Sequence, residues 1–89
     1  MANPTWRAAL LRYQTRSALA TRARRLPFSV QSVGSALIVT PGSGLQRRIT
    51  QSQFEKSLPL IDGAGRALLL EASYNSSYIE AIVDDLRRA

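Results

Sequence analysis

The chain has 89 residues, enough for one small domain with a single modest core. It contains no cysteine and no histidine, which removes disulfides, iron–sulfur clusters and thiolate zinc sites, and also the commonest general base. No apolar run approaches the roughly 20 residues that cross a bilayer. We therefore expect a non-enzymatic protein with no cofactor, no metal and no membrane span.

The formal net charge of +6 is divided unevenly along the chain. Residues 1–48 hold eight arginines and no acidic residue, a charge of +8, whereas residues 49–89 hold four basic and six acidic residues, a charge of −2. Arginine suits bidentate contacts to phosphate or carboxylate. This asymmetry indicates a nucleic acid or an acidic protein surface as partner, and it equally allows the two halves to attract each other within the fold.

Residues 4–26 are predicted to form a basic amphipathic helix of about 20 residues. Asn3 and Pro4 provide a cap and a first-turn proline, and Pro27 ends the helix. The apolar side of this helix comprises Trp6, Ala9, Leu10, Tyr13 and Ala20. The arginine-rich, acid-free composition is also that of a mitochondrial transit peptide, which is the alternative to the cytoplasmic location that we otherwise expect.

Residues 28–49 have the character of strands. Apolar residues 28, 30 and 33 lie near alternation, and the segments 36–40 and 45–49 flank the turn Pro41–Gly44. This pattern predicts a β-hairpin over about residues 36–49, with Gly34 either ending an earlier strand or forming a bulge. Arg47 and Arg48 then point to opposite faces of the second strand.

Residues 50–89 are expected to form two or three short helices. Ser52 and Glu55 have the spacing of a capping box, and Pro59 limits the helix that they begin. Residues 66–72 have no useful periodicity, and propensity favours helix over strand there.

A final helix is predicted from a second capping box, Ser77 and Glu80. Its apolar face is either core or a protein interface and comprises Tyr78, Ile79, Ile82, Val83 and Leu86. Asp84 and Asp85, near its negative end, are either solvated or contacts for a basic surface. The predicted fold class is thus α+β in a single domain, with a basic helix or arm (1–27), a β-hairpin region (28–49) and a helical part (50–89).

No motif in the sequence assembles a catalytic or metal site. Glu71 is not followed by the lysine that an Asp-Glu-x-Lys nuclease carries, and the serines have no histidine to activate them. Glu80 and Asp84 are the ordinary i, i+4 polar pair of a helix. The Pro41–Gly44 loop lacks the Gly-Lys-Ser/Thr ending of a phosphate-binding loop, so we interpret it as a hairpin turn.

Residues 66–86 resemble the helix, turn and second helix of helix-turn-helix DNA-binding domains, because a short polar turn leads into Ser77-Tyr78-Ile79. The resemblance implies contacts to base edges from the start of the second helix, at Asn75, Ser76, Ser77 and Tyr78. The acidic residues on the outer face of that helix depart from the pattern, since they would repel phosphates. A helical hairpin that closes a small core explains the same residues.

Basic and aromatic residues together form the strongest functional pattern. The predicted phosphate contacts are Arg7, Arg12, Arg16, Arg22, Arg24, Arg25, Arg47 and Arg48. Trp6 and Tyr13 are candidates for stacking on bases, unless they face the core. A buried Trp6 would make the N-terminal helix part of the fold, and an exposed one would make it an arm.

The sequence therefore predicts a small nucleic-acid-binding protein or accessory subunit, for DNA or RNA. The alternative is a protein-interaction module, such as a mobile-element or phage-type inhibitor or an assembly subunit. In that case the basic helix docks on an acidic partner, and the apolar face of the final helix is buried across an interface with that partner or in a homo-oligomer.

Overall fold

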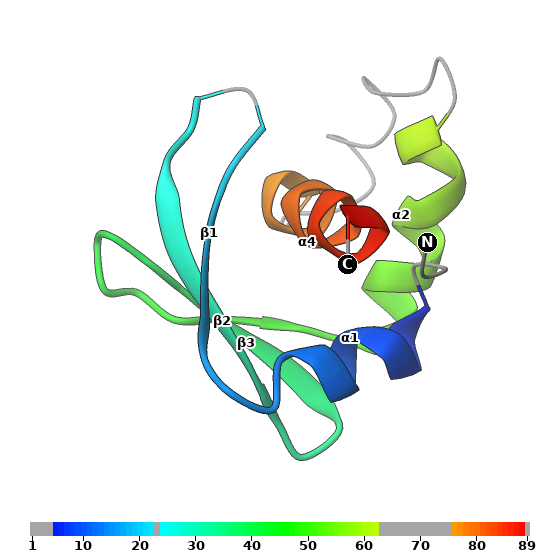
Figure 1. Cartoon of the computed structure of the whole chain (residues 1–89), viewed down its shortest axis with the longest axis horizontal. Helices are drawn as coiled ribbons and strands as arrows, with labels where there is room; N and C mark the ends of the chain where they lie inside the picture. The colour runs from blue at the N-terminus through cyan, green and yellow to red at the C-terminus, as the bar shows by residue number, and fades with distance from the viewer. Residues whose placement is uncertain (1–4, 23, 63–75, 89) are drawn as a thin grey trace.

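Four antiparallel strands and three helices make up the part of the chain that the computed structural model describes, residues 5–22, 24–62 and 76–88 (Figure 1). In chain order these elements are α1 (Trp6–Arg12), β1 (Ser17–Ala20), β2 (Pro27–Val33), β3 (Ala36–Pro41), β4 (Arg47–Ile49), α2 (Gln51–Asp62) and α4 (Ser76–Arg88). The strands form one sheet in the order β1-β2-β3-β4, and the described helices gather on one side of it. The α+β class is therefore confirmed.

The N-terminal helix is much shorter than predicted. α1 begins after Thr5, whose Oγ1 accepts a hydrogen bond from the Ala8 N–H at 3.0 Å, and it ends at Arg12. The chain then forms β1, which pairs with β2 from Ser17↔Val30 to Ala20↔Pro27. The sheet partner decides the conformation here, because pairing with β2 lets Leu19 pack against the core. The helical spacing of the apolar residues gave no indication of this pairing between β1 and β2.

The predicted hairpin over residues 36–49 is one part of a larger sheet. β3 pairs with β4 from Leu37↔Ile49 to Val39↔Arg47, and β2 pairs with β3 along its length. β4 is shorter than predicted, because the turn after Pro41 extends through Gln46 and leaves Leu45 72% exposed. Gly34, at φ +62°, ends β2 in the tight turn to β3, which is the first of its two predicted roles.

α2 begins two residues earlier than the predicted capping box implies. Thr50 is the cap: its Oγ1 accepts from the Gln53 N–H at 3.3 Å, and its own N–H donates to Gln53 Oε1 at 3.4 Å. Ser52 and Glu55 therefore lie inside the helix. Pro59 does not limit α2, which continues to Asp62 while Ile61 packs against the core.

α4 also begins before its predicted cap, since Ser76 is already helical and Ser77 lies in the first turn. Glu80, the other half of that predicted box, is buried and hydrogen-bonded to Arg22. The predicted helix or strand at residues 66–72 lies outside the described residues.

The core lies between the inner face of the sheet and the three helices. From the sheet and α2 it takes Phe28, Val30, Leu37, Val39, Ile49 and Phe54. Ile79, Ile82, Val83 and Leu86 of α4 are buried in it as well, so this face is core rather than an exposed interface. Trp6 is only 7% exposed, with its ring centroid 5.6 Å from that of Phe54. The N-terminal helix is thus part of the fold and not an arm.

Candidate nucleic-acid interface

Two of the predicted phosphate-binding arginines are paired with acidic residues of α4. Arg12 makes a bidentate contact to Asp85, with Nε donating to Oδ2 at 2.7 Å and Nη2 to Oδ1 at 3.3 Å. Arg22 donates to Asp84 through Nε at 2.9 Å and Nη2 at 2.6 Å, and through Nη1 to Glu80 Oε2 at 3.3 Å. The two halves of the chain therefore attract each other within the fold, and these two arginines do not belong to the candidate interface.

Tyr13 completes this arrangement from inside the core. Its side chain is fully buried, and its hydroxyl donates a hydrogen bond to Asp85 Oδ2 at 2.6 Å. Burial, followed by the hydrogen bond to Asp85, raises the pKa of Tyr13. Burial would raise the pKa of Asp85, but the hydrogen bonds from Arg12 and Tyr13 and the charges of Arg12 and Arg88 outweigh it, so that this pKa is lowered. The carboxylate of Asp85 is held ionised between its donors.

The two aromatic residues considered for base stacking face the core instead. Trp6 packs on Phe54 and Tyr13 is bonded to Asp85, so neither ring is exposed to a base. Burial at helical spacing is the common fate of such residues, because their large apolar area stabilises the core. Arg47 is half-buried on the inner side of β4, with its guanidinium carbon 5.9 Å from the centroid of the Tyr78 ring.

The outer face of the sheet, away from the described helices, carries the remaining strand arginines. Gln31 pairs with Ile38, and Ile38 pairs with Arg48, so these side chains form one row across three strands. Arg16, directly before β1, extends the row at the opposite edge, because Ser17 pairs with Val30. The row crosses four strands, a span of about 14 Å at the usual strand spacing. Arg47 and Arg48 lie on opposite faces, as predicted.

A hollow of about 310 Å³ lies on this outer face. It is lined by Arg16, Ser29, Gln31, Val33, Ile38, Thr40 and Gln46. Its polar side chains are hydroxyls and amides, which donate to phosphate and sugar oxygens. Sequence reasoning identified Arg16 but missed the other polar residues; their signal was the alternation of polar residues 29 and 31 with the buried residues 28 and 30 in one strand.

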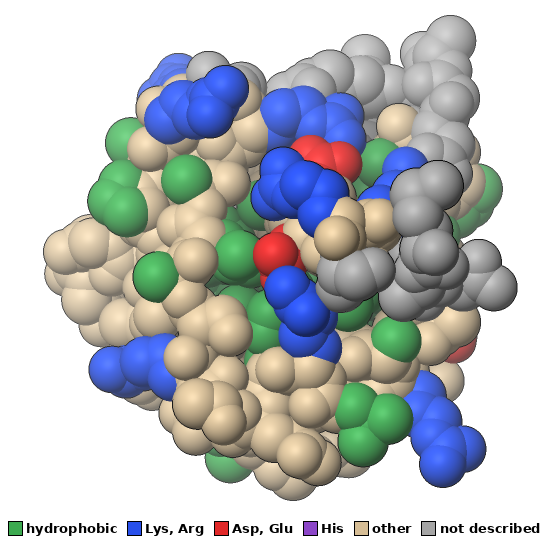
Figure 2. All heavy atoms as spheres, viewed as in Figure 1, with side chains coloured by type: hydrophobic (Ala, Val, Ile, Leu, Met, Phe, Trp, Pro, Cys, Tyr) green, Lys and Arg blue, Asp and Glu red, His purple; other side chains and the backbone are tan. Residues whose placement is uncertain are grey.

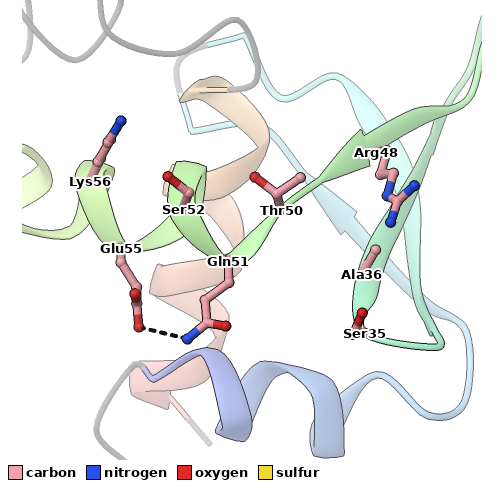
Figure 3. A pocket seen from close by; sticks show the side chains of 8 residues that line it. All are labelled: Ser35, Ala36, Arg48, Thr50, Gln51, Ser52, Glu55 and Lys56. Carbon is pink, nitrogen blue, oxygen red and sulfur yellow. Dashed lines mark hydrogen bonds between the residues drawn. The ribbon is translucent and has the colours of Figure 1, made fainter.

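A second hollow of about 680 Å³ lies beside the first, where β4 leads into α2 (Figure 3). Thr50 and Ser52 lie between the side chains of Arg48 and Lys56. The hollow also contains one carboxylate, Glu55, whose Oε2 accepts a hydrogen bond from the Gln51 amide at 3.2 Å. Arg48 lines this second hollow and pairs with Ile38, which lines the first, so the two hollows adjoin on one surface, which we call the outer sheet surface. Lys56 was not among the predicted contacts.

The outer sheet surface contains almost no negative charge. The first acidic residue of the chain is Glu55, so none of the four strands carries a carboxylate. Arg24 and Arg25 are exposed in the turn between β1 and β2, and Arg7 is exposed on α1. The arrangement can bind an extended anion by charge and hydrogen bonds, with an arginine at each edge of the sheet.

Among the described residues, no group of three acidic side chains is placed to hold a metal ion. Glu80, Asp84 and Asp85, the acidic set on the last helix, bind Arg12 and Arg22 instead. Residues 66–75 of the segment that resembles a helix-turn-helix lie outside the described residues. Of the predicted base contacts, Ser77 is exposed. Tyr78 packs edge-on against Phe28, with the two ring centroids 5.1 Å apart.

Within residues 5–22, 24–62 and 76–88, no helix is both long enough and apolar enough to cross a membrane. No family model matches the sequence, and no curated protein and no solved structure is significantly similar to it.

Proposed function

We propose that this chain is a non-enzymatic nucleic-acid-binding domain that contacts the phosphate backbone through the outer sheet surface. The observation that carries the proposal is the row in which Arg16 and Arg48 occupy the two edges of an acid-free sheet face. A nucleic-acid strand lying across the four strands would meet a guanidinium at each end and amide or hydroxyl groups between them.

Backbone contacts rather than base stacking are the expected mode of binding. Trp6 and Tyr13 are buried, and the side chains that line the two hollows include no aromatic ring. Binding should therefore depend weakly on sequence and strongly on salt, because releasing counterions from neutralised phosphates supplies most of the affinity. Both DNA and RNA present the required phosphates.

Fluorescence anisotropy with labelled single-stranded and duplex DNA and RNA tests the proposal. We expect binding at about 50 mM salt that weakens steeply by about 200 mM. Replacing both arginines, Arg16→Ala with Arg48→Ala, should remove two phosphate contacts and reduce the steepness of log K against log salt by about 1.8 for duplex DNA.

The matched control is Arg7→Ala with Arg88→Ala, which removes the same net charge from exposed positions outside the outer sheet surface. This control should retain most of the affinity. Absence of binding to every oligonucleotide at about 50 mM salt would refute the proposed function, and equal losses in the two double variants would refute the assigned surface.

A further inference from the structure

A groove separates the edge strand β1 from α4, at the side of the molecule rather than on the outer sheet surface. It has a volume of about 480 Å³. β1 contributes the consecutive residues Ala18, Leu19 and Ala20, followed by Thr21. α4 contributes one helical face, Ala81, Asp84, Asp85 and Arg88. Because neighbouring residues of a strand point to opposite faces, a groove lined by all of them is lined by the edge of the strand. β1 is the edge strand that lies beside α4 (Figure 1).

The hydrogen-bond pattern of the hairpin shows which backbone groups point into this groove. The Thr21 N–H donates to the Leu26 carbonyl at 3.0 Å, across the turn between β1 and β2. Bonded and non-bonded pairs alternate along an antiparallel ladder, so Leu19 and Ser17 also bond to β2. Ala18 and Ala20 therefore turn their N–H and carbonyl groups away from β2. An edge strand with such outward groups is a template for a further strand.

Charge at the groove favours an acidic occupant. Asp84 and Asp85 are already paired with Arg22 and Arg12. Arg25 and Arg88 line the groove with exposed side chains. The backbone of Arg25 is in the left-handed region, at φ +56°, and its N–H donates to the Thr21 carbonyl at 3.0 Å, which fixes the turn at the end of the groove. Figure 2 shows basic side chains surrounding the acidic ones on this face.

A second copy of this chain is a poorer match to the groove than a single extended segment. Its β1 would arrive with β2 already paired on the opposite edge. A single extended segment has no such neighbour. The overall charge of +6 further disfavours a second copy and favours an acidic segment.

We propose that the groove between β1 and α4 binds an extended acidic segment of a partner protein, which adds a fifth strand to the sheet beside β1. Main-chain hydrogen bonds to Ala18 and Ala20 hold the segment, and its carboxylates meet Arg25 and Arg88. β1 is four residues long, so the bound stretch is about 13 Å in length. This site goes beyond the proposed function and does not depend on it.

The test is a nuclear magnetic resonance titration of the ¹⁵N-labelled chain with an acetylated octapeptide of alternating valine and glutamate, at up to millimolar concentration. A peptide of alternating valine and lysine is the charge control. We expect only the acidic peptide to shift the Ala18 and Ala20 amide signals and to slow their hydrogen exchange. No change at these two amides, or equal changes with the lysine peptide, would overturn the proposal.

Ala18→Pro shows whether the peptide forms main-chain hydrogen bonds to β1 or only binds near it. The substitution removes an N–H that points into the groove and leaves the bonds of Leu19 to β2 in place. Ala18→Ser retains that N–H and is the matched control. Binding should be lost in the proline variant and kept in the serine variant. Binding that survives Ala18→Pro would overturn the main-chain contact.

A charge variant keeps the test decisive if Ala18→Pro does not fold. Arg25→Glu with Arg88→Glu changes two exposed side chains and should weaken binding of the acidic peptide about tenfold or more. Unchanged affinity would overturn the assigned charge contacts. An oligonucleotide added instead of the peptide should leave the Ala18 and Ala20 amides unaffected, which distinguishes this site from the outer sheet surface.

Discussion

Asp85 is the residue at which the two ends of the chain meet. It accepts hydrogen bonds from Arg12 and Tyr13, which lie 73 and 72 positions away in the sequence. The guanidinium is partly exposed, so the Arg12–Asp85 ion pair by itself contributes little to stability. The Tyr13 hydroxyl is buried, and a buried hydrogen bond to an ionised carboxylate contributes more.

Tyr13→Phe should lower the free energy of unfolding by about 1–2 kcal/mol, because it removes this donor and keeps the ring in the core. Urea denaturation followed by the fluorescence of Trp6, the single tryptophan, measures the change. Tyr78→Phe is the control, since its ring still packs against Phe28, and it should cost less. Equal losses in the two variants would show that the Tyr13 hydroxyl has no special role.

At the scale of elements, local sequence patterns located several of the strands and helices. Contacts between distant segments determined the conformation of the others. The alternation of residues 28 and 30 and the turn at Pro41–Gly44 located the strands, because each is a local property. The N-terminal segment was predicted as a single helix because its arginines and apolar residues have helical spacing. Its second half became β1 through pairing with β2, which local spacing does not encode.

The candidate site also depends partly on local sequence patterns and partly on contacts between distant segments. Arg16 and Arg48 could be selected as basic and exposed, but only the register of the strands places them in one row. Arg12 and Arg22 looked equivalent to them in the sequence. Their partners on α4 lie 58 or more positions away, so the sequence pattern alone could not show that Arg12 and Arg22 are held by acidic residues of α4.

The start of α2 offers a direct measurement of which residue caps the helix. Thr50→Ala removes a side chain that bonds the Gln53 N–H and should lower the free energy of unfolding by about 1 kcal/mol. Ser52→Ala, at the cap predicted from sequence, lies within the helix and should cost little. Urea denaturation of both variants tests this assignment, which a larger loss for Ser52→Ala would contradict.

At the scale of the whole molecule, α4 neutralises part of the charge that the N-terminal half brings to the fold. Arg12 and Arg22 reach Asp84, Asp85 and Glu80, so the +8 and −2 segments are joined rather than separated. Because Arg12 and Arg22 are paired within the fold, exposed positive charge remains on the outer sheet surface and in the turn after β1. The same pairing makes the stability of the fold sensitive to acid.

Because hydrogen bonds and nearby positive charge lower the pKa of Asp85 in the folded chain, the unfolded chain takes up this proton at a higher pH. The stabilisation is therefore fully present above the ordinary pKa of an aspartate and is lost as the pH falls through the lower, folded value. We expect the free energy of unfolding to decline below about pH 5.

Asp85→Asn should make that decline shallower and reduce the free energy of unfolding at neutral pH. The control is Glu55→Gln, at an exposed residue outside these ion pairs, which should leave the decline and the stability at neutral pH nearly unchanged. Urea denaturation between about pH 7 and pH 2 measures the slopes, and a slope unaltered by Asp85→Asn would contradict the role assigned to this carboxylate.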